Sequence, residues 1–244
     1  MRKFYILLFG LFFITCSPDK LDDCLGATGA ITSQVVQLSD FSKLNVGEGV
    51  EVELIEHPVH KIEIQTGHHS QKYVSFQVTD GELFLKNSLT CTLGYVKPAV
   101  IKVYTPNLIH IYSNSQFNMY AKQTLFFPNL TIEHGLTMKN ASSVFHININ
   151  TNNLIIQTNN LSSFVLTGQA NNLSVSFWGG GSRLEAYNFQ ANHVRIIQRS
   201  TNNMYINALQ SIKGTIYGYG NVYLKQAPLT IDVVELYKGK LIVD

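Results

Sequence analysis

Carboxylates are the residues of this 244-residue chain whose types could support catalysis. Glycoside hydrolysis needs a pair of them, and elimination on an acidic polysaccharide needs clustered acids holding calcium beside a basic residue. Beyond residue 105 the acidic side chains are Glu133, Glu185, Asp232, Glu235 and Asp244. They do not recur at a fixed spacing, and only Asp232 and Glu235 lie close together in the sequence. The sequence therefore predicts no catalytic site.

Histidines and glycines give no cofactor site either. The pairs His57/His60 and His68/His69 have no Cys or acidic partner at the spacing of a metal site, so we expect exposed loop histidines and no metal. Gly179 to Ser182 follows an apolar run but leads into another one, which is typical of a turn and not of a phosphate loop. We expect no cofactor.

Aromatic residues are the better candidates for binding. They accumulate in the last third of the chain, where a stacked sheet face could align them into a platform for sugar rings. The candidate ligand-binding residues are Trp178, Tyr187, Tyr217 and Tyr219, with Arg183 beside them. The alternative is that strand alternation places about half of these aromatic residues in the core or a subunit interface, and that the arginine lies on a solvated face.

The N-terminus has the pattern of a targeting segment. Arg2 and Lys3 precede an apolar run, residues 4–14, that is too short to span a bilayer, so residues 1–15 are predicted to be a signal peptide. The run ends at Cys16 and resembles a bacterial lipobox, with Thr15 at a position where Gly, Ala or Ser is commoner. The alternative is an ordinary signal peptide.

Residues 16–30 would then form a lipidated tether. The acid-rich stretch after Cys16 resembles the export signal of Bacteroidetes-type lipoproteins on the outer face of the outer membrane. Surface exposure is favoured, and the periplasmic face stays open.

Two further cysteines, Cys24 and Cys91, remain once Cys16 is acylated. An even pair in an exported chain favours a disulfide over a metal site. Such a bridge would stabilise the fold by about 4 kcal/mol in the chain-entropy model. The alternative is two separate buried thiols.

The charge balance argues against nucleic-acid binding. Without Arg2 and Lys3 the basic residues number 18 − 2 = 16, which equals the 16 acidic ones. A neutral chain lacks the basic stripe that phosphate recognition needs. Its few charges and many neutral polar residues suit contact with carbohydrate or protein.

Period-two alternation is the main structural signal, and no helix is expected after the signal peptide. In residues 31–105, Val50, Val52 and Leu54 alternate with glutamates, as in half-buried strands. Asp80-Gly81 lies between two alternating runs, which predicts a hairpin. This gives an N-terminal β region at 31–105.

Residues 106–244 contain a repeat of about 20 residues. Each unit begins with Pro-Asn or Asn-Asn before an apolar anchor such as Leu130, Leu154 or Leu173, and continues through a small-residue turn into a second strand. Two strands per coil predict a flattened, parallel β-helix, because single units cannot bury their apolar face alone. Stacked Asn side chains could hydrogen-bond along its corner. A meander of hairpins is the competing geometry.

Residues 24–244 resemble the bacterial auto-transporter adhesin, head GIN domain family. The resemblance depends on residues 38–44, the run 49–54, the Asp80-Gly81 hairpin, the Cys91 region before Lys97-Pro98 and the turn-centred repeats. The family's Gly-Ile-Asn corresponds to Gly49-Val50-Glu51, and several turns carry Asn or Ser where the family favours Gly. The resemblance implies a pectin-lyase-like right-handed β-helix, an adhesive role and no catalytic residues.

The leading hypothesis is a lipid-anchored, non-enzymatic β-helical protein of the cell envelope that binds a surface glycan or protein. In this hypothesis the protein contacts the membrane only through its lipid anchor. The hypothesis also allows a homo-oligomer. Two alternatives stay open: a polysaccharide-acting enzyme or accessory protein, which needs converging carboxylates in a groove, and a purely structural envelope lipoprotein.

Overall fold

The computed structural model describes residues 29–89, 98–136 and 141–244, and nearly all of their regular structure is β-strand. The first half holds β1 (Ile31–Gln37), β2 (Lys43–Val46), β3 (Val50–Glu56), β4 (Lys61–Gly67), the 3-10 helix η1 (His68–Tyr73), β5 (Val74–Thr79), β6 (Glu82–Asn87), β7 (Ala99–Thr105), β8 (His110–Ser113), β9 (Met119–Tyr120) and β10 (Asn129–His134). The second half holds β11 (Ser142–Thr158), β12 (Leu161–Phe177), β13 (Arg183–Gln198), β14 (Met204–Ile216), β15 (Val222–Leu224), β16 (Thr230–Glu235) and β17 (Leu241–Val243).

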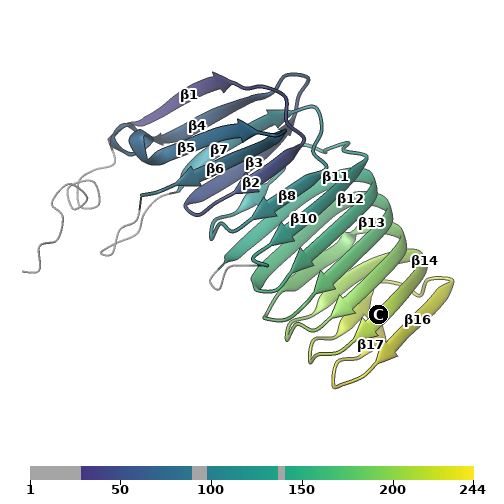
Figure 1. The fold of residues 1–244 in the computed structure, drawn as a ribbon. Coiled ribbons are helices and arrows are strands. Elements are labelled where there is room, and N and C mark those ends of the chain that lie inside the picture. Colours follow the sequence, from purple (N-terminus) through teal and green to yellow (C-terminus); the bar gives the residue numbers. More distant parts are fainter. Residues whose placement is uncertain (1–28, 90–97, 137–140) are drawn as a thin grey trace, which may run out of the picture.

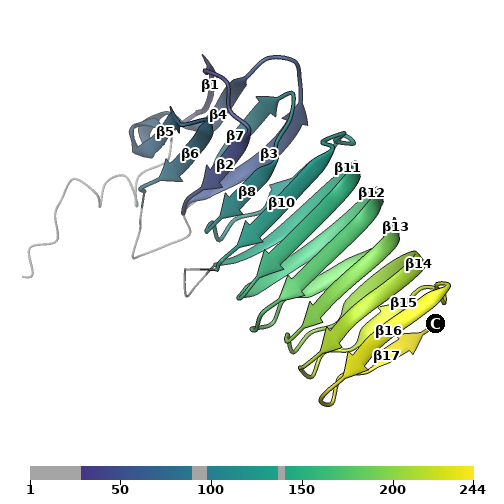
Figure 2. The same cartoon turned by 45° about the vertical axis from the view of Figure 1, so that its right-hand side comes forward.

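The long strands β11 to β14 stack as successive coils (Figures 1 and 2). Each long strand takes part in two ladders, one through its first half and one through its second half. β9 pairs with the first half of β11, and β10 pairs with the second half of β11. In the same way, β15 pairs with the first half of β14, and β16 pairs with the second half of β14. The stack therefore has two sheets. We call the outer surface of β3, β9, the first halves of β11–β14, β15 and β17 face 1. The outer surface of β2, β8, β10, the second halves and β16 is face 2.

All pairings between coils are parallel. One column of partners runs through Leu130, Leu154, Leu173, Val194, Ile212 and Ile231, which lie 24, 19, 21, 18 and 19 residues apart. This excludes the hairpin meander and confirms the parallel β-helix with coils of about 20 residues.

The N-terminal region is a mixed sheet that continues the coils. β5 and β6 form the predicted hairpin, with Asp80 at φ 50° and Gly81 at φ 72° in its two-residue turn. β1, β4 and β7 pair antiparallel, whereas β2 and β3 pair parallel with β8 and β9. The prediction of no helix is wrong for η1, because the connection from β4 to β5 forms a six-residue 3-10 helix.

The core lies between the two sheets. The alternating residues that point inward are almost fully buried, including Phe145, Phe164 and Phe177. The Phe145 and Phe164 rings stack with centroids 4.7 Å apart, and Phe177 continues the contact at 6.1 Å. Stacked large side chains of this kind are the principal source of stability in a solenoid, because each coil buries its apolar face only against its neighbours.

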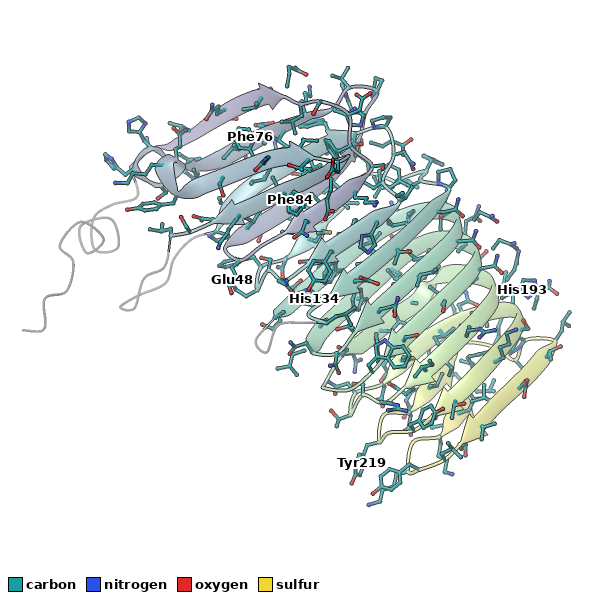
Figure 3. All side chains as sticks on the ribbon, in the orientation of Figure 1. Glu48, Phe76, Phe84, His134, His193 and Tyr219 are labelled. Carbon is teal, nitrogen blue, oxygen red and sulfur yellow. The ribbon has the colours of Figure 1, made fainter. Side chains whose placement is uncertain are left out.

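His134 occupies one of these inward positions (Figure 3). It follows Leu130 and Ile132 at period two, is fully buried and packs edge-on against the Phe145 ring at 5.0 Å. Burial lowers the pKa of His134 to about 4, and the backbone of Ser113 offsets only part of this effect. His134 is therefore a neutral core histidine, which the sequence analysis did not single out.

Side-chain ladders cover the coil corners. Asn172 donates to Asn153 at 2.8 Å and Asn192 donates to Asn171 at 3.1 Å, which confirms the predicted Asn stacking. At the opposite corner, Ser182 and Ser200 are buried and donate to the carbonyls of Asn160 and Ser182, respectively. These bonds satisfy backbone groups that a tight turn leaves unpaired.

The last coil exposes apolar side chains, among them Leu229 (82% exposed) and Leu236 (60%). No helix in the three described ranges is long and apolar enough to pass through a bilayer.

Candidate binding surfaces

The structure divides the five predicted ligand-binding residues into two groups. Arg183 and Tyr187 belong to β13 on face 1. Trp178, Tyr217 and Tyr219 lie in the turns that follow β12 and β14, along one edge of the stack. The single aromatic platform expected from the sequence is therefore two separate surfaces.

On face 1 three tyrosines form a cluster, because parallel register aligns Tyr205 with Tyr223 in the next coil. Their rings stack at 5.1 Å with 9° between the planes, and Tyr187 meets Tyr205 edge-on at 5.4 Å. Arg183 covers the Tyr205 ring at 4.7 Å and pairs with Glu185. The cluster presents half-buried rings fixed by neighbours on both sides.

A bulge in β13 turns Tyr187 out of the ladder. Ala186 pairs with Ile206 and Gln190 with the next residue, Asn207, so residues 187–189 have no partner in β14. Bulges of this kind redirect side chains. The Tyr187 hydroxyl donates to the Asp244 carboxylate, and burial followed by this contact raises the pKa of the phenol.

The bulge opens an amide-lined hollow of about 410 Å³ beside the tyrosines. Its lining residues are Asn150, Gly168, Gln169, Tyr187, Asn188, Gln190, Asn207 and Lys225. Gly168 has φ +107°, and a Cβ there would lie 2.2 Å from the Ile149 carbonyl oxygen, so the hollow requires glycine at this position. We call this site the amide hollow. Amides that both donate and accept hydrogen bonds suit the hydroxyl groups of a neutral sugar.

The turn edge carries the remaining aromatic residues. Tyr219 is 55% exposed, and its hydroxyl lies 3.2 Å from that of Tyr237 (Figure 3). Arg199 covers the Tyr217 ring at 4.5 Å. Trp178 is 41% exposed and donates to Gln157 at 3.3 Å. These side chains lie on projecting turns.

The five carboxylates of the coils do not converge on one site. Glu133 pairs with His110 at 3.3 Å and Glu235 with Lys240 at 2.8 Å. Asp232 and Glu235 are three residues apart on β16, so they occupy opposite sides of the strand. Glu185 and Asp244 are held by Arg183 and Tyr187 at the face 1 cluster.

Sequence reasoning missed an acidic cluster on β3. Glu51 and Glu53 both point outward beside Tyr120 of β9, and Lys122 pairs with Glu53 at 3.1 Å. Desolvation raises the pKa of Glu51, and desolvation together with the two carboxylates raises the pKa of Tyr120 to about 12. Alternation in residues 50–54 shows both glutamates on one face, but only the β3–β9 register brings Tyr120 to them.

The described ranges contain no group of three or more His, Asp, Glu or Cys residues that could hold a metal ion. His60 is mostly buried and bonded to Asp40 and Phe41, not exposed. Cys16, Cys24 and Cys91, with the predicted lipidation site and disulfide, lie outside the described residues.

Comparison with known proteins connects this fold to a family. The family model described as putative auto-transporter adhesin, head GIN domain, matches residues 40–228. No curated protein matches the chain. A putative adhesin from Bacteroides fragilis has a similar structure, with a TM-score of 0.79, 19% identity and coverage of 88% of this chain and 97% of that one.

Two further solved structures are similar over the same 88% of this chain. A putative lipid binding protein from Parabacteroides distasonis has a TM-score of 0.62 at 13% identity, and a putative adhesin from Parabacteroides merdae has 0.58 at 18%. The match covers 97% of each of those chains. At such identities the likeness shows a common fold.

Proposed function

We propose that this chain, which belongs to the putative auto-transporter adhesin, head GIN domain family, is a cell-surface adhesin that binds a neutral glycan in the amide hollow without catalysis. The observation that carries the proposal is the combination of that hollow with the tyrosine cluster bordering it. The hollow of about 410 Å³ falls within the size range of small-ligand sites.

The amide hollow and the tyrosine cluster offer complementary chemistry to a sugar. Sugar hydroxyls would exchange hydrogen bonds with Gln169, Asn188 and Gln190, while the apolar face of a sugar ring would pack on Tyr187. Because Tyr187 is held by Tyr205 and Asp244, little side-chain entropy is lost when a ligand packs on it. No Asp or Glu is among the residues that line the amide hollow, which supports binding without bond cleavage.

Substitution of Tyr187 by Ala tests this proposal on an array of neutral glycans. We expect binding of the best ligand to weaken about tenfold, which corresponds to about 1.4 kcal/mol for a lost stacking contact. Gln169→Ala should weaken it to a similar degree. Titration calorimetry with the same glycan measures both effects.

Turn-edge variants provide the matched control, since Trp178→Ala and Tyr219→Ala remove exposed aromatic rings from another surface. They should bind like the wild type. Loss of binding in these variants, with Tyr187→Ala unaffected, would move the site to the turn edge. A wild-type protein that binds no neutral glycan would favour protein contact or a structural role.

We further propose that Cys16 anchors the protein to the outer membrane through lipid. Replacement of Cys16 by Ser removes the thiol that is acylated, so we expect the protein to move from the membrane fraction to the soluble fraction of its host cells. Protease treatment of intact cells then separates surface exposure from the periplasmic face. A Cys16→Ser protein that still sediments with membranes would contradict the anchor.

A further inference from the structure

Face 2 carries a second hollow, of about 430 Å³, on the sheet opposite the tyrosine cluster. Two rows of register partners line it. One row is Asn153, Asn172, His193 and Ser211, and the other is Ile155, Ser174, Arg195 and Lys213. His193, labelled in Figure 3, points outward from the coils.

Two cations, Arg195 and Lys213, lie side by side in this hollow, and neither forms an ion pair with a described carboxylate. Arg195 and Lys213 are register partners, so their backbones are about 4.8 Å apart, and both side chains are exposed. In the described ranges no hydrogen bond or ion pair engages either side chain. Asp232 is the next register partner of Lys213, but they form no ion pair within 4.0 Å. Like charges directly opposite each other repel, and a bound anion would relieve this repulsion.

Ser174 has the shortest side chain of the second row. It lies between Ile155 and Arg195 in the row, and its short side chain leaves the Arg195 guanidinium free to reach an anion from the side. Ile155, which is 38% exposed, supplies an apolar wall. A planar guanidinium binds a carboxylate with two parallel hydrogen bonds.

The other row supplies neutral hydrogen-bonding groups. Asn172 donates to Asn153 at 2.8 Å, and His193 bonds to Ser211 at 2.9 Å, so each group is held in place by its neighbour. Asn172 uses one bond in this ladder and Asn153 uses two, because Asn153 also donates to Asn129, and both amides retain further hydrogen-bonding capacity for a ligand. A carboxylate surrounded by hydroxyl groups matches this pattern of cations beside amides.

From these observations we infer that the face 2 hollow is a second binding site, for a glycan whose sugars carry carboxylates. The carboxylate lies between Arg195 and Lys213, the hydroxyls bond to the amide row, and an apolar sugar face packs on Ile155. The site does not depend on the amide hollow of face 1.

Calorimetry with a hyaluronan hexasaccharide, in which glucuronate alternates with a neutral sugar, tests the inference. We expect Arg195→Ala and Lys213→Ala each to weaken binding at least tenfold, and the methyl-esterified hexasaccharide to bind at least tenfold more weakly to the wild type. Binding should also fall as salt is raised from 50 to 300 mM, because exposed charges are screened. Melting temperatures equal to the wild type confirm that the surface variants are folded.

Two controls make the result specific. Lys43→Ala removes one exposed cation from face 2 about 24 Å away, five ladder steps from Arg195, and should bind like the wild type. Tyr219→Ala removes an exposed ring from the turn edge, outside both hollows, and should also leave this binding unchanged. Equal loss from Lys43→Ala, equal binding of the ester, or equal binding of a glutamate hexapeptide would each overturn an acidic-glycan site.

Discussion

Substitution of Gly214 by Ala is expected to destabilise the protein by about 4 kcal/mol. Gly214 lies in the inward column of β14 with φ +141°, and a Cβ there would lie 2.0 Å from the Ile196 carbonyl oxygen in the preceding coil. Backbone strain at such a φ costs about 1–3 kcal/mol, and displacing a packed neighbour costs about 1–3 kcal/mol more. Both costs apply together because the parallel ladder holds the two strands at a fixed separation.

Urea unfolding followed by circular dichroism measures this effect, with Gly81→Ala as the matched control. Gly81 also has positive φ, at +72°, but nothing lies within 4 Å of its added Cβ. The control should therefore lose about 1 kcal/mol, which is the cost of the left-handed conformation alone. If the two variants lose the same stability, the close approach of β14 to Ile196 is not a constraint.

Acidification is expected to destabilise the wild type through His134 by about 2 kcal/mol between pH 7 and pH 5. The pKa of His134 is lowered from 6.5 to about 4 in the folded protein, so the unfolded chain binds a proton that the folded chain excludes. The stability that depends on the neutral ring is complete above pH 6.5 and is lost as the pH falls toward 4.

His134→Leu has a side chain of similar size that cannot ionise, and it should remove this part of the pH dependence. The free energy of unfolding at pH 7 and at pH 5, from urea titrations, gives the difference for each protein. His69→Leu is the control, since His69 is exposed on η1 and the wild-type pH dependence should persist. A His134→Leu protein as sensitive to acid as the wild type would show that another group is responsible.

The strands and their stacking could be predicted because their signals are local or periodic. Alternation at Val50, Val52 and Leu54 follows from the two-sided strand, and Asp80-Gly81 marks the hairpin through its positive φ. The recurrence of Leu130, Leu154 and Leu173 indicates coils because only stacked units bury such anchors. His134 continues the inward alternation after Leu130 and Ile132, so the sequence already contained the signal for its burial.

The sequence did not show how the candidate site residues are distributed. Arg183 and Tyr187 lie together on face 1, whereas Trp178, Tyr217 and Tyr219 lie on the turn edge. The pairing of Tyr205 with Tyr223 depends on the β14–β15 register, and the position of Tyr187 depends on the bulge at residues 187–189, which have no partner in β14. A bulge shifts the pairing register of every residue that follows it in the strand. No short-range sequence pattern indicates how many residues the bulge contains.

By itself, the sequence determined that the chain is built of strands, that the strands form coils, and that one hairpin precedes them. These properties depend on side-chain alternation and turn conformation within about 20 residues. Only the tertiary structure decided which side chains become neighbours: the amides beside Tyr187 on face 1, and Arg195 beside Lys213 on face 2. The physical reason is that residues from separate coils meet through inter-strand register, which hydrogen bonds and core packing set jointly along the whole stack.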